Sequence, residues 1–262
     1  MKLLWLWVTL GVLAGAALVW LFVWFNNSCL KTARFKVKID GAPQLKIAHL
    51  SDLHGKRFGR RNSRLINKVK KLAPDAIFVT GDIIHLYTPA NKEAALEAVS
   101  SLKEIAPVIY VAGNHEMRNK GYRFFRKDLK EAGATVLDDE VIKVCGITVA
   151  GLNCASLRND KINKITPAVS PKILLAHEPQ FFEKYARAGY DLVFCGHAHG
   201  GQWRIPFTGI GLYAPGQGKF PKYTAGLYKS GNTVMCVSRG LGNSEFPLRL
   251  FNRPEIVFMQ IN

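Results

Sequence analysis

The chain has few acidic residues, and its cysteines are not spaced in pairs. It has 262 residues, with 19 Asp and Glu against 36 Lys and Arg, which gives a formal net charge of +17. The five cysteines are odd in number and show no paired spacing, so a disulfide framework is not expected. Three of them, Cys145, Cys195 and Cys236, lie in apolar runs and are predicted to be core residues.

Charge is missing altogether from the first segment. Leu3 to Phe25 contains no charged residue across 23 positions. As a helix this segment would be about 35 Å long, which is enough to cross the apolar core of a bilayer. Aromatic residues gather toward its ends, as in the aromatic belt of a membrane-spanning helix: Trp5, Trp7, Trp20, Trp24 and Phe25. Residues 1–28 are therefore predicted to form a transmembrane anchor.

A cleaved signal peptide is the alternative interpretation of this segment. Its apolar core would be shorter, about 7–15 residues, and a small-residue cleavage site would follow it. Residues 25–29 read Phe-Asn-Asn-Ser-Cys, which is a poor site of that kind, so we expect an uncleaved anchor. Lys31, Arg34, Lys36 and Lys38 follow the segment, whereas only Lys2 and the amino terminus precede it. The positive-inside rule then places the body of the protein in the cytoplasm.

A basic stretch without any acidic residue spans positions 56–71. It contains Lys56, Arg57, Arg60, Arg61, Arg64, Lys68, Lys70 and Lys71. Next to a membrane anchor, such a stretch favours contact with the membrane surface or with an anionic lipid substrate. A solvated basic face is the second interpretation. Nucleic acid is not an expected partner, because no nucleic-acid motif or interleaved aromatic platform is present.

The rest of the chain alternates between strand and helix patterns. A basic linker with a first strand is expected at 29–44, and one catalytic domain at 45–262. Apolar runs predict strands at 46–50, 76–79, 108–111, 141–145, 147–152, 172–175, 192–195, 226–228, 233–237 and 256–260. Helical spacing predicts helices after a cap at Asn62-Ser63 and at 91–102, 122–132 and 180–188. This is a layered α/β fold, in which two facing sheets are flanked by helices.

Polar clusters follow five of these strands, at the edge where ligands bind to open α/β sheets. They contain Asp52 and His54, then Asp82, then Asn114 and His115, then His177, and finally His197 and His199. Taken singly, Asp52 or Asp82 is most simply a cap or turn residue. Five such clusters in this order and placement favour a functional site.

The composition of these clusters indicates a metal centre. Carboxylate, imidazole and amide ligands without a thiolate suit Mn, Fe or Zn. Seven candidate ligands are too many for one ion that keeps an open position, but they fit two ions bridged by a carboxylate, and Asp82 is the natural bridge. Two ions about 3.5–4 Å apart can clamp the attacking and leaving oxygens of an in-line displacement at phosphorus.

The order of these motifs resembles the calcineurin-like metallophosphoesterase superfamily. The motifs are Asp-x-His at 52–54, Gly-Asp at 81–82, Gly-Asn-His-Glu at 113–116, His177, and Gly-His-x-His at 196–199. Segments 225–228, 238–242 and 253–255 are similar to its bacterial membrane-associated phosphodiesterase branch. Two departures, Ala198 in place of a usual Thr and Gln180 in place of a frequent Asp, remove no ligand.

The resemblance implies a role for each residue. Asp52, His54 and His199 would hold one metal ion, Asn114, His177 and His197 the other, and Asp82 would bridge them, with Mn favoured. His115 and Asp82 would be the catalytic residues, and His115 would face the substrate. Arg239, Arg249 and Arg253 are candidates for contacts with the substrate phosphate. The alternative for these three arginines is surface salt bridging.

These observations predict a membrane-anchored two-metal phosphoester hydrolase of the bacterial inner membrane, with one membrane pass and a cytoplasmic catalytic domain. The simplest form is a phosphodiesterase in which a metal-bridging hydroxide attacks phosphorus in line. One alternative is a UDP-2,3-diacylglucosamine pyrophosphatase of lipid A synthesis, with a lipid-linked substrate. An alternative from another class is a metal-stabilised scaffold without catalytic activity.

Overall fold

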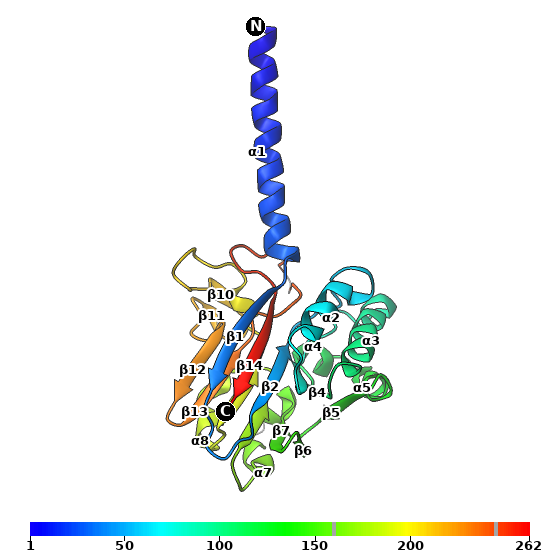
Figure 1. Cartoon of the computed structure of the whole chain (residues 1–262), viewed down its shortest axis with the longest axis vertical. Helices are drawn as coiled ribbons and strands as arrows, with labels where there is room; N and C mark the ends of the chain where they lie inside the picture. Colours follow the sequence, from blue (N-terminus) through cyan, green and yellow to red (C-terminus); the bar gives the residue numbers. More distant parts are fainter. Residues whose placement is uncertain (159–160, 244–245) are drawn as a thin grey trace.

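Two six-stranded sheets lie face to face in the computed structural model (Figure 1), which describes residues 1–158, 161–243 and 246–262. The strands of the first sheet, in spatial order, are β1 (Lys31–Val37), β14 (Glu255–Ile261), β2 (Leu45–Leu50), β3 (Ala76–Thr80), β4 (Val108–Val111) and β5 (Ala134–Leu137). Those of the second are β12 (Gly226–Ser230), β13 (Thr233–Val237), β9 (Leu192–Cys195), β8 (Lys172–Leu175), β7 (Ile147–Gly151) and β6 (Glu140–Val144). The predicted two-sheet α/β fold is therefore confirmed.

The core between the sheets is built from strand residues that alternate in direction. Ile47, Phe78 and Ile109 from the first sheet share a buried cluster with Ile173 and Phe194 from the second. Burial of each such side chain contributes about 1.5–3 kcal/mol. Strand β3 is buried on both faces, since its other side packs against helices, which explains why it is an uninterrupted apolar run.

Helices cover the outer faces of both sheets. The first sheet carries α2 (Ser63–Lys70), α3 (Pro89–Lys103) and α5 (Tyr122–Glu131), and the second carries α7 (Ile162–Ile165) and α8 (Phe182–Arg187). Short elements complete the described chain: α4 (Asn114–Met117), α6 (Cys154–Arg158), the 3-10 turns η1 (Arg60–Asn62), η2 (Pro179–Phe181) and η3 (His199–Gly201), and the ribbon of β10 (Tyr213–Ala214) and β11 (Gly218–Lys219).

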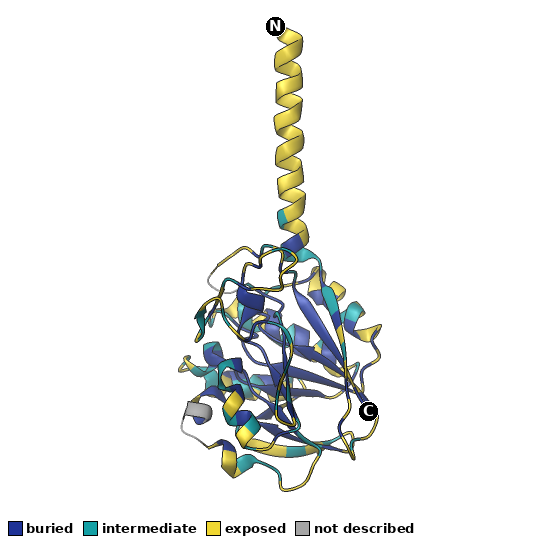
Figure 2. Cartoon of the chain, turned by 90° about the vertical axis from the view of Figure 1, so that its left-hand side faces the viewer, coloured by how far each residue is buried: buried dark blue, intermediate teal, exposed yellow. Residues whose placement is uncertain are grey.

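Helix α1 (Lys2–Ser28) projects from the body and is exposed along almost its whole length (Figure 2). Only its last two turns contact the body, where Asn26 is buried and the ring of Phe22 lies 5.1 Å from that of Phe251. The rest of this 27-residue apolar helix is exposed, and the helix is long and apolar enough to cross a membrane.

Strand topology places α1 at one particular end of the first sheet. β1 begins three residues after α1 ends, and it pairs in parallel with β14 through Lys31 and Glu255. β14 in turn pairs antiparallel with β2, which is parallel to β3 and β4. The carboxyl ends of β2, β3 and β4 therefore lie at the same end of the sheet as the foot of α1.

Several local expectations need correction. Cys145 is exposed, because it occupies the turn between β6 and β7 with a φ of 50°, and so it is not a core residue. Asn62 does not cap α2, because its Oδ1 instead accepts a hydrogen bond from Phe58 N at 3.0 Å. The helix predicted at 180–188 is a 3-10 turn at Pro179–Phe181 followed by α8. Strand β5 was not predicted.

Candidate metal centre

Three of the predicted ligands form a first buried group. The side chains of Asp52 and His54 follow β2, and His199 follows β9; their ligand atoms all lie within 4.8 Å of one another. The Nε2 atoms of His54 and His199 are 3.2 Å apart, and His199 Nε2 is 3.6 Å from Asp52 Oδ1. Two neutral imidazoles and a carboxylate that converge in this way form a set that can hold a divalent ion.

A second group contains Asp82, His177 and His197. His177 Nε2 lies 3.1 Å from Asp82 Oδ2, 3.1 Å from His197 Nδ1 and 3.1 Å from the amide oxygen of Asn114. The other ring nitrogen, His177 Nδ1, donates a hydrogen bond to the carbonyl of Thr80 at 2.6 Å. That bond fixes the tautomer and leaves Nε2 free to bind an ion, as in many metal sites.

One oxygen of Asp82 lies between the two groups. Asp82 Oδ2 is 3.1 Å from His177 Nε2 in the second group and 3.9 Å from His54 Nε2 in the first. The structure thus brings together all seven side chains predicted as ligands, with Asp82 in the middle. The residues fit two divalent ions that share this carboxylate.

Backbone conformation also marks the site. Asp52, His54, Asp82, His197 and His199 have φ angles between 46° and 66°, a region that residues other than glycine seldom adopt. Such conformations persist only where the surrounding structure holds them, and they cluster at functional sites. Here hydrogen bonds hold them: the amide of His197 donates to both carboxylate oxygens of Asp52, at 3.0 and 3.1 Å.

Burial sets the charge of the ligands. It lowers the pKa of His54 and of His197 to about 3, so both rings are neutral at pH 7, the form that binds metal. Burial alone would also lower the pKa of His177, but the carboxylates of Asp82 and Asp52 raise it to about 10. Without an ion, a proton on His177 balances part of the buried negative charge.

Glu116 supports the site without being one of the predicted ligands. Its carboxylate is fully buried and accepts hydrogen bonds from the amides of Asp82 and Gly113, at 2.8 and 2.9 Å, and of Ile84, at 3.1 Å. It therefore ties the loop after β3 to the loop after β4. The sequence held a signal for it, since Glu116 completes the Gly-Asn-His-Glu motif.

His115 lies beside the two groups and is half-buried. Its amide donates to Asp82 Oδ1 at 2.9 Å, and its Nδ1 lies 3.1 Å from the carbonyl of His85. Because a carbonyl can only accept, Nδ1 carries the proton and Nε2 is left for other partners. His85 also lies close, with its ring 5.0 Å from that of His115, although the sequence gave it no role.

The candidate ligands open into a cavity of about 540 Å³. Asp82, Asn114, His115, His197 and His199 line it together with Arg118 and Gln180. Arg118 was not predicted. It is the C-cap residue of α4 and follows Asn114 by four residues, so its spacing from Asn114 could have indicated that both lie on the same side of that turn. It brings a positive charge to the cavity.

The three arginines predicted to bind substrate phosphate all have partners within the chain. Arg239 Nε lies 3.4 Å from the carboxylate of Glu255. Arg249 does not fit the surface salt bridge expected as the alternative, because it is fully buried and donates to the carbonyl of Gly242. Arg253 donates to the carbonyls of Cys29 and Leu30 and stacks on the ring of Phe25. Among the described residues, the cavity of about 540 Å³ beside the candidate ligands, called here the metal-side cavity, is lined by other side chains and not by these three arginines.

The fold and the site together define a candidate two-metal centre, and comparison with known proteins shows that its class is the metal-dependent phosphoester hydrolases. The family described as calcineurin-like phosphoesterase matches residues 45–201, a segment that includes all five motifs. The chain is 32% identical to phosphodiesterase YaeI of Escherichia coli, over 91% of this chain and 88% of that one. It is also 32% identical to the uncharacterised metallophosphoesterase YkuE of Bacillus subtilis, over 81% of this chain and 76% of the other.

The chain therefore belongs to the calcineurin-like phosphoesterase family. Among solved structures, it is similar to TT1561 of Thermus thermophilus, with a TM-score of 0.49 and 14% identity over 76% of this chain and 91% of that one. Enzymes of this family generally use two divalent metal ions, and the two groups that contain a carboxylate agree with that number. A third group of converging side chains, His54, His85 and His115, contains imidazoles alone and shares His54 with the first.

Proposed function

We propose that this protein is a membrane-anchored phosphodiesterase that uses two metal ions. The observation that carries the proposal is the position of Asp82 Oδ2 between the group of Asp52, His54 and His199 and the group of His177 and His197. Asn114 joins the second group through its amide oxygen. Similarity to a protein named as a phosphodiesterase supports the choice of diesters over monoesters.

Two divalent ions held by these ligands, with Mn favoured, would polarise the phosphoryl oxygens and lower the pKa of a water to supply the nucleophile. The remaining chemistry belongs to the side chains of the cavity. Arg118 attracts the anionic phosphodiester into the cavity. His115, whose Nδ1 is engaged with His85 O, can direct Nε2 to the phosphoryl group and, when protonated, can protonate the leaving alkoxide.

We further propose that α1 crosses the bacterial inner membrane and that the catalytic domain faces the cytoplasm. The length and composition of α1 and the basic residues after it support this. The basic stretch 56–71 lies beside the foot of α1: Lys56 Nζ donates to Asn27 O and Lys68 Nζ to Leu30 O, each at 2.6 Å. Its remaining basic side chains are thereby held close to the anionic leaflet, which attracts them.

The hydrolysis of bis-p-nitrophenyl phosphate tests the proposed activity. The full-length protein with Mn²⁺ should hydrolyse this diester, and the variant His115→Ala should lose a factor of about 10²–10⁴ in kcat. The variant Asp82→Asn should lose activity as well. Asp40→Asn, a change at an exposed aspartate, is the matched control. An inactive wild type, or equal turnover in all four proteins, would contradict the proposal and favour the scaffold alternative.

A further inference from the structure

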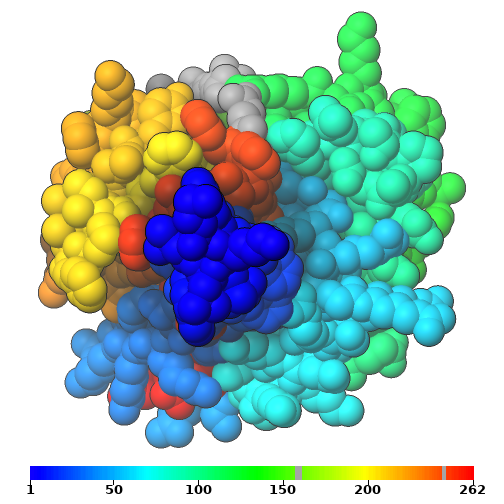
Figure 3. All heavy atoms as spheres, turned by 90° about the horizontal axis from the view of Figure 1, so that it is seen from above, coloured from blue at the N-terminus to red at the C-terminus, as the bar shows by residue number. Residues whose placement is uncertain are grey.

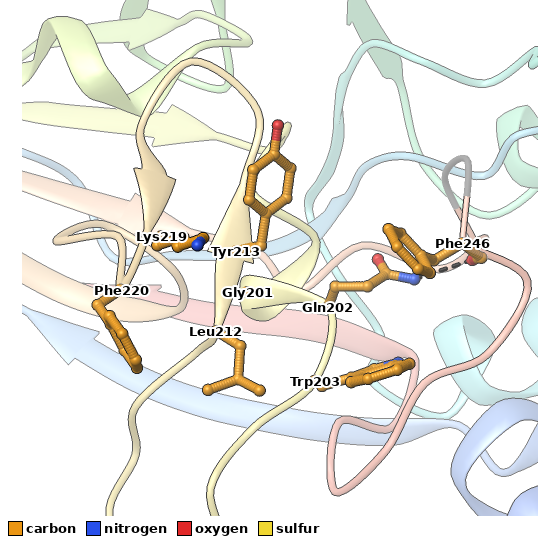
Figure 4. A pocket seen from close by; sticks show the side chains of 8 residues that line it. All are labelled: Gly201, Gln202, Trp203, Leu212, Tyr213, Lys219, Phe220 and Phe246. Atoms are coloured by element: carbon orange, nitrogen blue, oxygen red, sulfur yellow. Dashed lines mark hydrogen bonds between the residues drawn. The ribbon is translucent and has the colours of Figure 1, made fainter.

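An apolar cavity of about 500 Å³ lies against the metal-side cavity, and no part of the proposed chemistry uses it. Trp203, Leu212, Phe220 and Phe246 line it, together with Tyr213 and Lys219. Figure 4 shows Leu212 and Tyr213 pointing to opposite sides of the β10 backbone, with the Leu212, Trp203 and Phe220 side chains gathered on the same side. Its volume is within the range of sites that bind small molecules.

The two cavities share part of their walls. Gln202, Tyr213 and Phe246 line both of them, and Gln202 follows directly after the η3 turn that begins with His199. The side-chain amide of Gln202 donates to the carbonyls of Phe246 and Leu248, at 2.9 and 3.2 Å, which holds the 246–248 segment against the site. A ligand whose phosphate lies at the metal groups can therefore extend directly into the apolar cavity.

The side-chain N–H groups of Gln202 and Trp203 in this wall already donate to backbone carbonyls. Trp203 Nε1 donates to Leu248 O at 3.0 Å, so the indole presents only its apolar ring, which packs 5.8 Å from the ring of Phe246. The surface formed by Trp203, Leu212, Phe220 and Phe246 offers only apolar groups, whereas a sugar or a nucleobase needs hydrogen bonds. It suits a hydrocarbon chain, whose transfer out of water is favourable in proportion to the area buried.

The apolar cavity also lies at the end of the body from which α1 emerges. In Figure 3, which looks down α1, the segments around 200–220 (yellow) and 246–251 (orange-red) lie beside the helix, on the left of it and above it. Phe251 contacts Phe22 of α1, with ring centroids 5.1 Å apart. The same segments expose further large apolar side chains, namely Ile205, Phe207, Ile210 and Leu248. Large apolar side chains exposed on segments beside an apolar helix favour a membrane or ligand site.

We propose that the apolar cavity binds the hydrocarbon chain of the substrate, so that the enzyme acts on a phosphodiester of an amphiphilic lipid presented at the membrane surface. This inference rests on the proposed phosphodiesterase function and names its substrate class. The reaction is unchanged: a bond forms between a water oxygen and phosphorus, the ester bond from phosphorus to the leaving oxygen breaks, and a proton passes to that oxygen. The chain remains in the cavity beside the metal groups.

A chain-length series tests the proposal. The full-length protein, in lipid nanodiscs with Mn²⁺, is given p-nitrophenyl diesters of methyl, butyl and octyl phosphate. We expect kcat/KM to rise with chain length, by up to about fourfold for each added methylene. The variant Phe220→Ser should flatten this rise and leave the methyl diester unchanged. Phe220 lines only the apolar cavity, and because it is 66% exposed the substitution does not disturb the core.

The matched control is Phe124→Ser, which removes an aromatic ring of similar exposure, 69%, on α5 and outside the apolar cavity. It reports any general effect of partition into the bilayer. Equal kcat/KM for all three diesters in the wild type would overturn this inference alone. So would a rise that Phe220→Ser and Phe124→Ser both leave intact. A wild type that hydrolyses none of the diesters would overturn the proposed function and this inference together.

Discussion

Asn27, in the last turn of α1, and Arg249, in the loop before β14, hold each other through two hydrogen bonds. Asn27 Nδ2 donates to Arg249 O at 3.2 Å, and Arg249 N donates to Asn27 Oδ1 at 2.8 Å. The Arg249 side chain continues the connection to Gly242, whose amide in turn bonds the carbonyl of Asp52. The end of the apolar helix is thus connected, through one loop, to a candidate metal ligand.

The variant Asn27→Ala tests this connection. It leaves the Arg249 amide and carbonyl without their partners, which should lower the free energy of unfolding of the body by about 1–3 kcal/mol. Thermal unfolding in detergent measures the loss. Thr9→Ala is the control, because it removes a hydrogen bond within the exposed part of α1. If both variants unfold at the wild-type temperature, the contact does not hold the helix to the body.

Glu116 offers a second test, because it acts on the site through the backbone. Glutamine supplies one acceptor oxygen where the carboxylate accepts three amide hydrogens. Glu116→Gln should therefore loosen the loops after β3 and β4 and weaken metal affinity about 10–100-fold. Calorimetric titration with Mn²⁺ measures the change, with the exposed Glu104→Gln as control. Unchanged affinity would show that the three hydrogen bonds do not position the ligands.

Lys56 makes stability depend on pH. Burial lowers its pKa from 10.5 to about 7 in the folded protein. Between these values the unfolded chain binds a proton that the folded chain does not, so the free energy of unfolding rises as pH rises from about 7 to 10.5. Lys56→Met should reduce the rise in Tm across that range relative to wild type. The control is Lys70→Met, at an exposed lysine of α2. An identical pH dependence in all three proteins would contradict the partly buried position of the ammonium group.

The orientation of α1 can be tested with reporters at the carboxyl terminus. The positive-inside rule predicts that a green fluorescent protein fusion is fluorescent and that an alkaline phosphatase fusion is inactive, since the latter needs export. Replacing Lys31, Arg34, Lys36 and Lys38 with glutamine removes the positive charges after α1, and this should reduce the preference for a cytoplasmic carboxyl terminus. Active alkaline phosphatase on the wild-type sequence would place the catalytic domain outside.

Much of the fold was readable from the sequence because its strands are short runs of β-branched and aromatic residues. β3, β4 and β9 were predicted within one residue, since each is buried on both faces and carries no polar interruption. The residues of the site were readable for a different reason. They follow strands whose carboxyl ends meet at one edge, so the order of the motifs already implied that they converge.

Contacts between distant segments were not readable. Nothing local in the sequence pairs Asn27 with Arg249, or places the ring of His85 beside His115, because these depend on how loops return after the sheets have formed. The apolar run that ends in Cys145 misled for the opposite reason: the tight turn to β7 directs that side chain outward. The two cavities could not be predicted from the sequence either, because the residues of their shared wall, 202, 213 and 246, are far apart along the chain.

The number of metal ions bound per chain tests the central claim most directly. Purified full-length protein, loaded with Mn²⁺ and freed of excess metal, should contain two ions by elemental analysis. His54→Ala and His197→Ala should each retain about one, because each removes a ligand from a different group. Asp82→Ala should bind both ions weakly. A single ion in the wild type, or a loss of both ions in either histidine variant with the fold intact, would contradict a two-metal centre bridged by Asp82.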